Sequence, residues 1–165
     1  MKKNAAPAPV WKKDPLLSFS LFSLSFSGGF FLYLLVEKIF KSFSHSAPHW
    51  SMGLCAGLAF LFLMLLDGIS LPLWTKALFG GLFVTLLELP AGLLLNLRYR
   101  MGVWDYSGMP LNYHGQICLS FSLLWCAASF GILLANRALC AAVFHLFTKV
   151  TGKKPDIIAQ KNENN

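Results

Sequence analysis

The sequence predicts an all-α membrane protein built as a bundle of four transmembrane helices. The chain of 165 residues is 56% hydrophobic and only 13% charged, whereas soluble domains are about 25% charged. Its mean hydropathy is +0.58. The apolar residues are gathered in four long runs, and about 20 apolar residues suffice to cross the hydrocarbon core as a helix. The length favours a single domain, and lipid must cover part of its apolar surface.

The basic residues lie mainly at the two ends of the chain. The formal net charge is +7, which in a soluble protein would suggest nucleic acid as a partner. Here the lysines flank the apolar runs, so membrane topology and anionic lipid headgroups explain them better. We therefore expect the lipid bilayer, and no nucleic acid, as a partner. Residues 1–15 are expected to form a flexible basic arm and residues 151–165 a flexible polar tail.

The four apolar runs define a transmembrane domain over residues 16–137. The first run contains an alternation of Ser and Phe that imitates the period of a strand. A lone strand cannot satisfy its backbone hydrogen bonds in lipid, so we expect a helix. The run is also longer than the apolar core of a cleaved signal peptide, so we expect it to be retained. The predicted spans are residues 16–36, 50–66, 76–97 and 116–135.

Residues 138–150 are apolar but too short to cross the membrane. Two arrangements stay open for them, a short helix that lies in the membrane interface and an extension of the fourth helix into the cytosol. Within the fourth helix, helical spacing predicts one shared face. The residues on that face are Gln116, Ser120, Ala127 and Gly131.

Glu88 lies almost at the centre of the third apolar run. An acid inside a transmembrane helix is costly, so it requires a role. One interpretation is a proton or cation site, or a contact to a substrate, within the bundle. The other is a structural acid held by a hydrogen-bonding neighbour. Helical spacing places four further small or polar residues on the same stripe of this helix, namely Gly81, Thr85, Gly92 and Asn96.

A compact polar loop over residues 98–115 follows this helix. Trp104 and Tyr106 combine an apolar body with a polar tip, which suits a membrane boundary. Asp105 and Ser107 can tie a turn by accepting hydrogen bonds from the backbone. We expect Trp104, Tyr106 and Ser107 to be structural. Two interpretations of the loop stay open, a cap that clamps the third and fourth helices and a binding or catalytic loop above the acid.

No residue pattern predicts a catalytic or metal centre. The four cysteines form no C-x-x-C pair and the four histidines lack metal-ligand spacing, so we expect no metal and no cofactor. Asp105, Ser107 and His114 share one short loop without a nucleophile elbow, which argues against a hydrolytic triad. No P-loop motif is present, so ATP hydrolysis would require a separate chain. We therefore name no catalytic residue.

The distribution of Lys and Arg predicts the orientation. With four spans, ten of the 14 basic residues fall on the side of the two termini, and four fall on the other side. Those four are Lys38, Lys41, Arg98 and Arg100. The positive-inside rule then places both termini in the cytoplasm. Glu37 and the polar loop share the outer side.

The segment from Gly80 to Trp125 resembles the core of the Putative ABC-transporter type IV family, which consists of small bacterial membrane proteins. The family pattern is a mid-helix Glu, a following Gly, W-D-Y-S, P-x-N and G-x-I-C leading to L-L-W. The matching residues are Glu88, Gly92, Trp104 to Ser107, Pro110 to Asn112, Gly115, Ile117, Cys118 and Leu123 to Trp125. Glu37 also fits a glutamate of the family. The family's upstream Pro-Ile-Tyr-Gly stretch is replaced here by SHSAPHWSMGLCAGLAF.

The resemblance implies a permease component in a bacterial cell membrane, which would need either a separate ATPase subunit as a partner or an ion gradient. On this hypothesis Glu88 is the substrate-binding or ion-binding group, and an outer mouth is lined by Glu37, Asp105, Asn112 and Gln116. Two alternatives stay open. One is a membrane-embedded enzyme acting on a lipid or other membrane substrate, with Glu88 and Asp105 as acid and base. The other is a non-catalytic assembly subunit. A homo-oligomer is also open.

Overall fold

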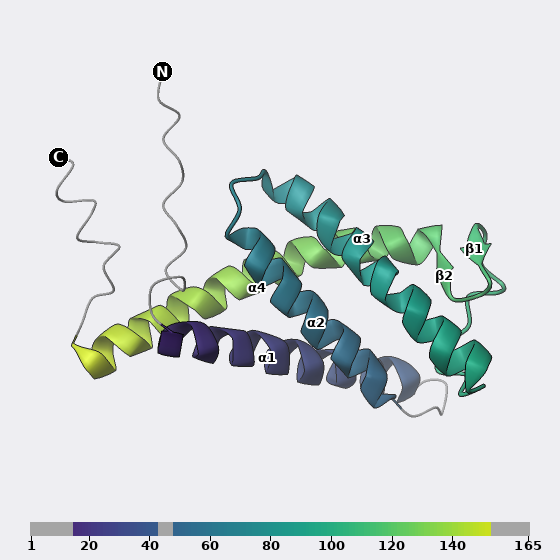
Figure 1. The fold of residues 1–165 in the computed structure, drawn as a ribbon, viewed down its shortest axis with the longest axis horizontal. Coiled ribbons are helices and arrows are strands. Elements are labelled where there is room, and N and C mark those ends of the chain that lie inside the picture. Colours follow the sequence, from purple (N-terminus) through teal and green to yellow (C-terminus); the bar gives the residue numbers. More distant parts are fainter. Residues whose placement is uncertain (1–14, 43–47, 153–165) are drawn as a thin grey trace, which may run out of the picture.

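The computed structural model describes residues 15–42 and 48–152, and it consists of four long helices with one small hairpin (Figure 1). The expected arm before Pro15 and the expected tail after Gly152 lie outside the described residues. The elements are α1 (Pro15–Ser42), α2 (Trp50–Asp67), α3 (Leu73–Gly92), the π-helix η2 (Leu93–Arg98), β1 (Asn112–Tyr113), β2 (Ile117–Cys118) and α4 (Leu119–Thr151).

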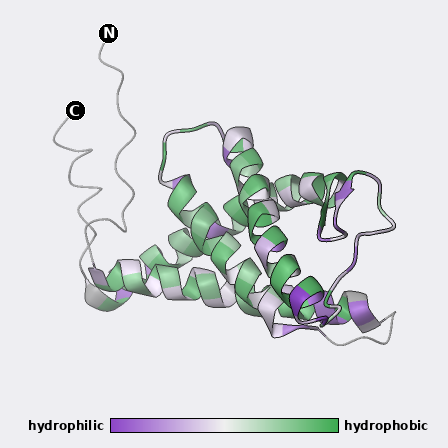
Figure 2. Cartoon of the chain, turned by 45° about the vertical axis from the view of Figure 1, so that its right-hand side comes forward, coloured by the Kyte–Doolittle hydropathy of each residue, from purple (hydrophilic) through white to green (hydrophobic). Residues whose placement is uncertain are grey.

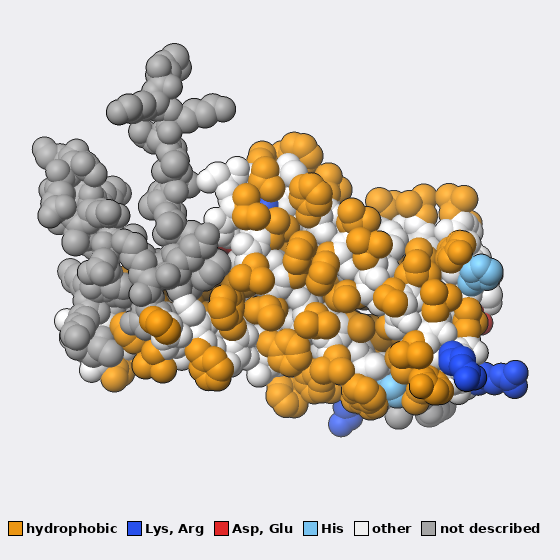
Figure 3. Space-filling model, in the orientation of Figure 1, with side chains coloured by type: hydrophobic (Ala, Val, Ile, Leu, Met, Phe, Trp, Pro, Cys, Tyr) orange, Lys and Arg blue, Asp and Glu red, His pale blue; other side chains and the backbone are white. Residues whose placement is uncertain are grey.

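Within residues 15–42 and 48–152, four helices are long and apolar enough to cross a membrane, which confirms the predicted all-α fold. The candidate spans are Pro15–Ile39, Trp50–Asp67, Leu73–Arg98 and Leu119–Val150. Figure 2 shows hydrophobic colour along the helices and more hydrophilic colour in the loop that holds the hairpin. In Figure 3, hydrophobic side chains cover most of the described surface in view. This surface matches the predicted contact with lipid.

The Ser/Phe segment is helical, as expected. It lies within α1, and the Ser20 hydroxyl donates to the Leu16 carbonyl 2.9 Å away, one helical turn earlier. Such a bond satisfies the serine hydroxyl inside its own helix, so the residue needs no water in lipid. The apparent strand period therefore does not prevent a helix.

The helices are arranged so that α1 and α2 are neighbours and α3 packs against α4 (Figure 1). One apolar cluster contains Leu63, Leu66, Ala77 and Leu133 and joins α2, α3 and α4. A second cluster joins the first turns of α1 to α2 and to the last third of α4. Its residues are Leu17, Leu21 and Met64, with Phe22, Leu61, Cys140, Val143 and Phe147 packed against them.

Helix α4 is continuous from Leu119 to Thr151. Residues 138–150 therefore continue α4 without a break. Its 33 residues give a rod about 50 Å long, which exceeds the ~30 Å hydrocarbon core. The extension has a packing partner, because the second apolar cluster places it beside α1.

Glycines allow close contact between α3 and α4. A methyl group on Gly81 would come within 2.6 Å of the Cys126 backbone nitrogen, and one on Gly80 within 2.7 Å of Ser129 Cβ. Further along the stripe, the Thr85 hydroxyl donates to the Ser122 hydroxyl at 3.0 Å. The small and polar stripe predicted for the third helix thus lies against α4.

The face predicted for the fourth helix loses Gln116, and its other three residues, Ser120, Ala127 and Gly131, lie on an exposed face of α4. Ser120 is exposed, and a Cβ on Gly131 would have no neighbour within 4 Å. Residues 117–118 are extended in β2 and α4 begins only at Leu119, so Gln116 lies outside the helix. The face that does meet the bundle carries Ser122, Trp125, Ser129, Leu133 and Asn136.

Candidate functional site

Glu88 is buried in the bundle, with 1% of its surface exposed. The Trp125 indole Nε1 donates to Glu88 Oε2 at 2.8 Å, and the Tyr106 hydroxyl donates to Glu88 Oε1 at 3.2 Å. Each carboxylate oxygen therefore receives one hydrogen bond from a neutral donor. The donors come from α4 and from the loop after α3, so the acid links three parts of the chain.

Glu88 also lines a cavity of about 60 Å³ to which all four helices contribute. A cavity of this size can hold water or a small ion, whereas pockets for larger ligands measure roughly 300–1,000 Å³. The other lining residues are Tyr33 from α1, Met52, Cys55, Ala56, Ala59 and Phe60 from α2, Val84 from α3, and Trp125 and Ile132 from α4.

Tyr33 brings a second polar group to this cavity. Its ring centroid lies 6.5 Å from that of Trp125, and it stands one helical turn before Glu37 on α1. Within residues 15–42 and 48–152, the Tyr33 hydroxyl has no hydrogen-bond partner. A tyrosine hydroxyl without a protein partner can bind water or a cation.

Tyr106 lets the polar loop reach the buried acid. Its ring stacks on Phe121, with centroids 4.5 Å apart and planes at 20°, and its backbone N–H donates to the Gly115 carbonyl at 2.8 Å. Burial, and then the nearby Glu88 charge, raise the pKa of the Tyr106 hydroxyl. The phenol therefore remains a donor at neutral pH. The loop both covers the ends of the helices and contributes directly to the Glu88 site.

Gln116 and Asn96 form a separate polar cluster at the end of α3. Asn96 Nδ2 donates to Gln116 Oε1 and to the Trp104 carbonyl, both at 2.9 Å. Gln116 Nε2 donates to the His114 carbonyl at 2.8 Å, and the Trp104 indole donates to the Gln116 carbonyl at 2.9 Å. Asn96 lies in η2, where the backbone takes a wider turn. This cluster fixes the loop to the end of the third span.

Asp105 and Asn112 shape the loop itself. Asp105 accepts from the Ser107 backbone N–H at 2.8 Å and from the Ser107 hydroxyl at 2.9 Å. These two bonds hold the pKa of Asp105 below its usual value. Asn112 Nδ2 donates to the Met109 carbonyl at 2.7 Å, and its Oδ1 accepts from the Gly115 N–H at 3.0 Å. Both side chains are exposed and are bonded within the loop.

Gly115 occupies a position that requires glycine. Its φ of +69° is in the left-handed region, and a Cβ there would come within 2.7 Å of Asp105 Oδ1. The short β1–β2 pair lies on either side of it, with Asn112 opposite Cys118 and Tyr113 opposite Ile117. This tight turn places the Gly115 carbonyl where it accepts a hydrogen bond from the Tyr106 backbone N–H.

Glu37 connects α1 to the same end of the bundle. It forms an ion pair with Lys41 at 2.9 Å and accepts from the His49 backbone N–H at 3.3 Å. Lys41 in turn donates to the Val103 carbonyl at 3.4 Å. Glu37 therefore links the end of α1 to the start of α2 and, through Lys41, to the loop.

The predicted site residues thus fall into separate groups. Glu88 lines the cavity, Gln116 belongs to the Asn96 cluster, and Glu37 to the α1–α2 connection. In the part of the chain that the structure describes, no hydrogen bond or ion pair joins these groups directly to Glu88. Periodicity did not single out Tyr33 and Trp125. An aromatic side chain with a polar tip inside an apolar span is the signal that could have found them.

The match to known proteins covers most of the chain. A family model described as Putative ABC-transporter type IV matches residues 22–158, which include most of α1, all of α2, α3 and α4, and the polar loop.

The chain belongs to the Putative ABC-transporter type IV family.

Membership of the Putative ABC-transporter type IV family and four apolar helices identify a multi-pass membrane protein that is a transporter component. No curated protein and no solved structure matches the chain. The match extends on both sides of the segment from Gly80 to Trp125 that resembles the core of the family. Glu88, Trp125 and the Tyr106 loop lie inside the matched region.

Proposed function

We propose that this protein is the membrane-spanning component of a transporter in which Glu88 binds the transported ion or a coupled proton. The observation that supports the proposal is the buried residue Glu88 among those that line a cavity where α1, α2, α3 and α4 meet. A site shared by all the spans is placed where a movement of any of them changes its shape.

The electrostatics of Glu88 support a cationic occupant. Both of its hydrogen-bond donors, Trp125 and Tyr106, are neutral. Within residues 15–42 and 48–152, no Lys, Arg or His forms an ion pair with Glu88. A charged carboxylate without a countercharge is costly inside a membrane. A bound proton or small cation removes that cost, and the 60 Å³ cavity has room for it.

The approach to Glu88 would run along α1 from the outer end. Glu37 and Tyr33 are one turn apart on this helix, and Tyr33 lines the cavity. Tyr106 occupies one Glu88 oxygen from the loop side. If the Tyr106 hydroxyl moved away, that Glu88 oxygen would be free to bind a cation. Asp105, Asn112 and Gln116 would hold the loop in the closed position.

The energy source is proposed to be a separate ATPase subunit or an ion gradient. The 165 residues contain no G-x-x-x-x-G-K-[ST] motif, so this chain does not supply a P-loop. Membership of an ABC-transporter family supports a partner that does.

We infer that both termini face the cytoplasm of a bacterial cell membrane. The first turn of α1 and the last turns of α4 lie at the same end of the bundle (Figure 1), and the positive-inside count favours the cytoplasm for that end. Single cysteines in place of Ser42 and Thr148, labelled with an impermeant maleimide on intact cells, test this. Labelling of the Thr148 position from outside contradicts the orientation.

The transport role is tested with Glu88→Gln, which keeps the shape and removes the charge. The full chain, purified with whatever subunits accompany it, is reconstituted in liposomes, and internal pH and cation content are followed by fluorescence under an imposed gradient. We expect Glu88→Gln to lose the flux while the thermal unfolding midpoint in detergent stays close to that of the wild type. Arg98→Gln, which removes a charge at an exposed residue with no part in the site, is the control. Wild-type flux through Glu88→Gln contradicts the proposal.

One observation favours a second candidate, a non-catalytic assembly subunit. Glu88 already links α3, α4 and the loop through two hydrogen bonds, which is enough for a structural acid. In that case Glu88→Leu loses a co-purifying partner, whereas Glu88→Gln retains it and no flux is found in either protein. The enzyme hypothesis gains no such support, because Asp105 is exposed and bonded to Ser107 rather than to the Glu88 cavity.

A further inference from the structure

A second and larger cavity lies at the opposite end of the bundle from the polar loop. Its volume is about 330 Å³, which is within the range of ligand pockets. It is formed where α2 ends, between the first turns of α1 and the second half of α4. The lining residues are Leu17, Leu21, Met64, Asp67, Gly68, Asn136, Arg137, Cys140, Ala141 and Phe144.

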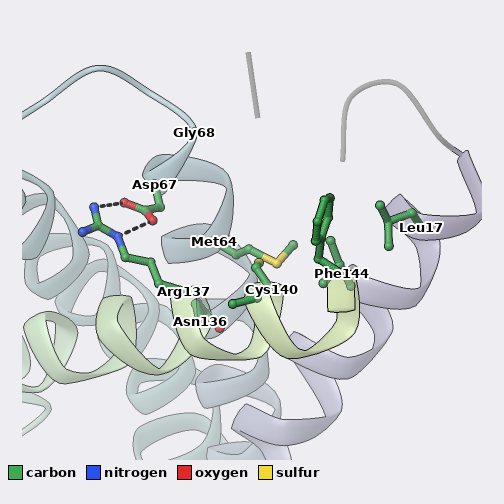
Figure 4. Close-up of a pocket in the computed structure, with 10 residues that line it drawn as sticks. Leu17, Met64, Asp67, Gly68, Asn136, Arg137, Cys140 and Phe144 are labelled. Carbon is green, nitrogen blue, oxygen red and sulfur yellow. Dashed lines mark hydrogen bonds and ion pairs between the residues drawn. The ribbon is translucent and has the colours of Figure 1, made fainter. Parts of the chain in front are cut away.

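The cavity is polar at one side and apolar at the other. Figure 4 shows Asp67 and Arg137 together at one side, Phe144 and Leu17 at the far side, and Met64 and Cys140 between them. A ligand that fills it must therefore carry both a polar group and an apolar group.

The polar side carries an excess positive charge. Asp67 is shared by two cations. Lys76 Nζ lies 2.8 Å from Asp67 Oδ1, and Arg137 binds both carboxylate oxygens, each at 2.7 Å. One carboxylate between two cations leaves a net charge of about +1 by simple counting. Asp67 is the one carboxylate among the described lining residues.

Arg137 is the cation that remains available to a ligand. The Lys76 side chain is 4% exposed, and its ammonium also donates to the Asp67 carbonyl at 2.8 Å. The Arg137 side chain is 48% exposed. A guanidinium has five N–H donors, and two of those of Arg137 bind Asp67. The others have no partner within residues 15–42 and 48–152, and phosphate is a preferred acceptor for such a group.

The side chain of the other polar residue that lines the cavity, Asn136, already has hydrogen-bond partners within the protein. Asn136 accepts from the Ser25 hydroxyl at 3.1 Å and donates to the Phe60 carbonyl at 2.9 Å. It fastens α4 to α1 and α2 and so keeps the cavity walls in place. Specificity for a ligand headgroup then depends on Arg137.

We propose that this cavity binds one anionic phospholipid of the bilayer, with its phosphate on Arg137 and the start of an acyl chain along Leu17, Cys140 and Phe144. Basic pockets between transmembrane helices suit anionic lipid headgroups. The predicted orientation places this end of the bundle in the cytoplasmic leaflet, where such lipids are common. The bound lipid joins α1 and α4 to the end of α2. The proposal does not depend on Glu88 or on transport.

The test is native mass spectrometry of the full chain, titrated with phosphatidylglycerol and with phosphatidylcholine that has the same acyl chains. We expect the first phosphatidylglycerol to bind about fivefold tighter, since one basic group near the membrane contributes about 1 kcal/mol. Equal affinities for the two lipids overturn the proposal. Glycerol phosphate supplies the anionic group without the acyl chains. If it binds as tightly as phosphatidylglycerol, the cavity is a site for a free anion and the lipid proposal is wrong.

Two pairs of variants locate the binding. Arg137→Gln removes the headgroup contact, and Arg98→Gln removes the same charge from an exposed position at the other end of the bundle. Ala141→Phe fills the cavity without altering the ion pairs, and Ala142→Phe adds the same ring at an adjacent exposed residue outside the lining. We expect Arg137→Gln and Ala141→Phe to lose the preference for phosphatidylglycerol over phosphatidylcholine. Both controls should retain this preference. If Arg137→Gln unfolds, Ala141→Phe decides, and a preserved preference there contradicts the proposal.

Discussion

The Trp125 indole nitrogen lies 2.8 Å from Glu88 Oε2, although the two residues are 37 positions apart in the chain. This hydrogen bond joins α3 to α4 in the middle of the bundle. It also aligns the indole with the wall of the shared cavity. The bond gives the buried acid a fixed position that neither helix could impose alone.

Replacing Trp125 with Phe should destabilise the bundle. The change removes the donor to Oε2 and leaves a buried acceptor without a partner. Hydrogen bonds between membrane helices contribute roughly 0.6 kcal/mol on average, up to about 1.7 kcal/mol, and we expect a loss at the upper end. Chemical unfolding in detergent measures it, with Trp74→Phe at an exposed position as control. A double-mutant cycle with Glu88→Gln isolates the pair, and zero coupling would contradict the hydrogen bond.

Replacing Tyr106 with Phe should weaken the Glu88 site while the loop stays folded. The phenyl ring retains the stacking on Phe121, so only the hydroxyl donor to Oε1 is lost. We expect a loss of about 0.5–1.5 kcal/mol. Hydrogen exchange of the Tyr106 and Gly115 amides reports on loop folding. Tyr113→Phe, at an exposed tyrosine of the same loop, should change nothing. An equal loss in both variants would show that the contact to Glu88 is not responsible.

Replacing Gly81 with Ala should separate α3 from α4. The added methyl would come within 2.6 Å of the Cys126 backbone nitrogen, which cannot move away as a flexible side chain could. Overpacking of this kind costs roughly 1–3 kcal/mol. Gly131→Ala, where the methyl meets open space, should be neutral or stabilising by up to about 1 kcal/mol. Thermal unfolding of both variants gives the comparison. A stable Gly81→Ala protein would mean that the helices are further apart than described.

Replacing Ser107 with Ala should raise the pKa of Asp105 towards its ordinary value. In the folded loop this pKa is lowered by the Ser107 backbone N–H and hydroxyl. A lowered pKa means that these bonds stabilise the loop above the ordinary pKa of Asp, and that this stabilisation is lost as the pH falls through the lowered value. Carbon NMR of the labelled Asp105 carboxyl measures the titration. Because the backbone donor remains in Ser107→Ala, part of the shift should persist. An unchanged titration would exclude the hydroxyl as a cause.

Hydropathy was sufficient to predict the four spans, because each helix must present about 20 apolar residues to lipid. The stripe around Glu88 could also be predicted from the sequence, since small and polar residues recur there with helical spacing. The hydrogen-bond partners of Glu88 could not be predicted from the sequence. Tyr106 reaches the acid through a loop held by side-chain bonds, and Trp125 reaches it across a helix interface, and no periodicity encodes such contacts.

The start of α4 shows the same limit at a smaller scale. Gln116 belongs to the hairpin and not to the helix, because the chain is extended at residues 117–118 before α4 begins. The cavity at Arg137 was hidden for a different reason. This cavity forms because α2 ends while α1 and α4 continue beside it. How the helices pack in this way cannot be deduced from the residue pattern of any one helix.

Helix α4 carries Trp125 at the acid and Arg137 at the second cavity on one uninterrupted rod, roughly 18 Å apart along its axis. A rotation of this helix that turns the indole away from Glu88 also turns the guanidinium relative to Asp67. If a ligand at one end drove such a rotation, its binding would change the affinity at the other end, and by thermodynamic reciprocity the effect would be equal in both directions. On the two proposals above, the lipid composition on one side of the membrane would then set how tightly Glu88 holds a cation.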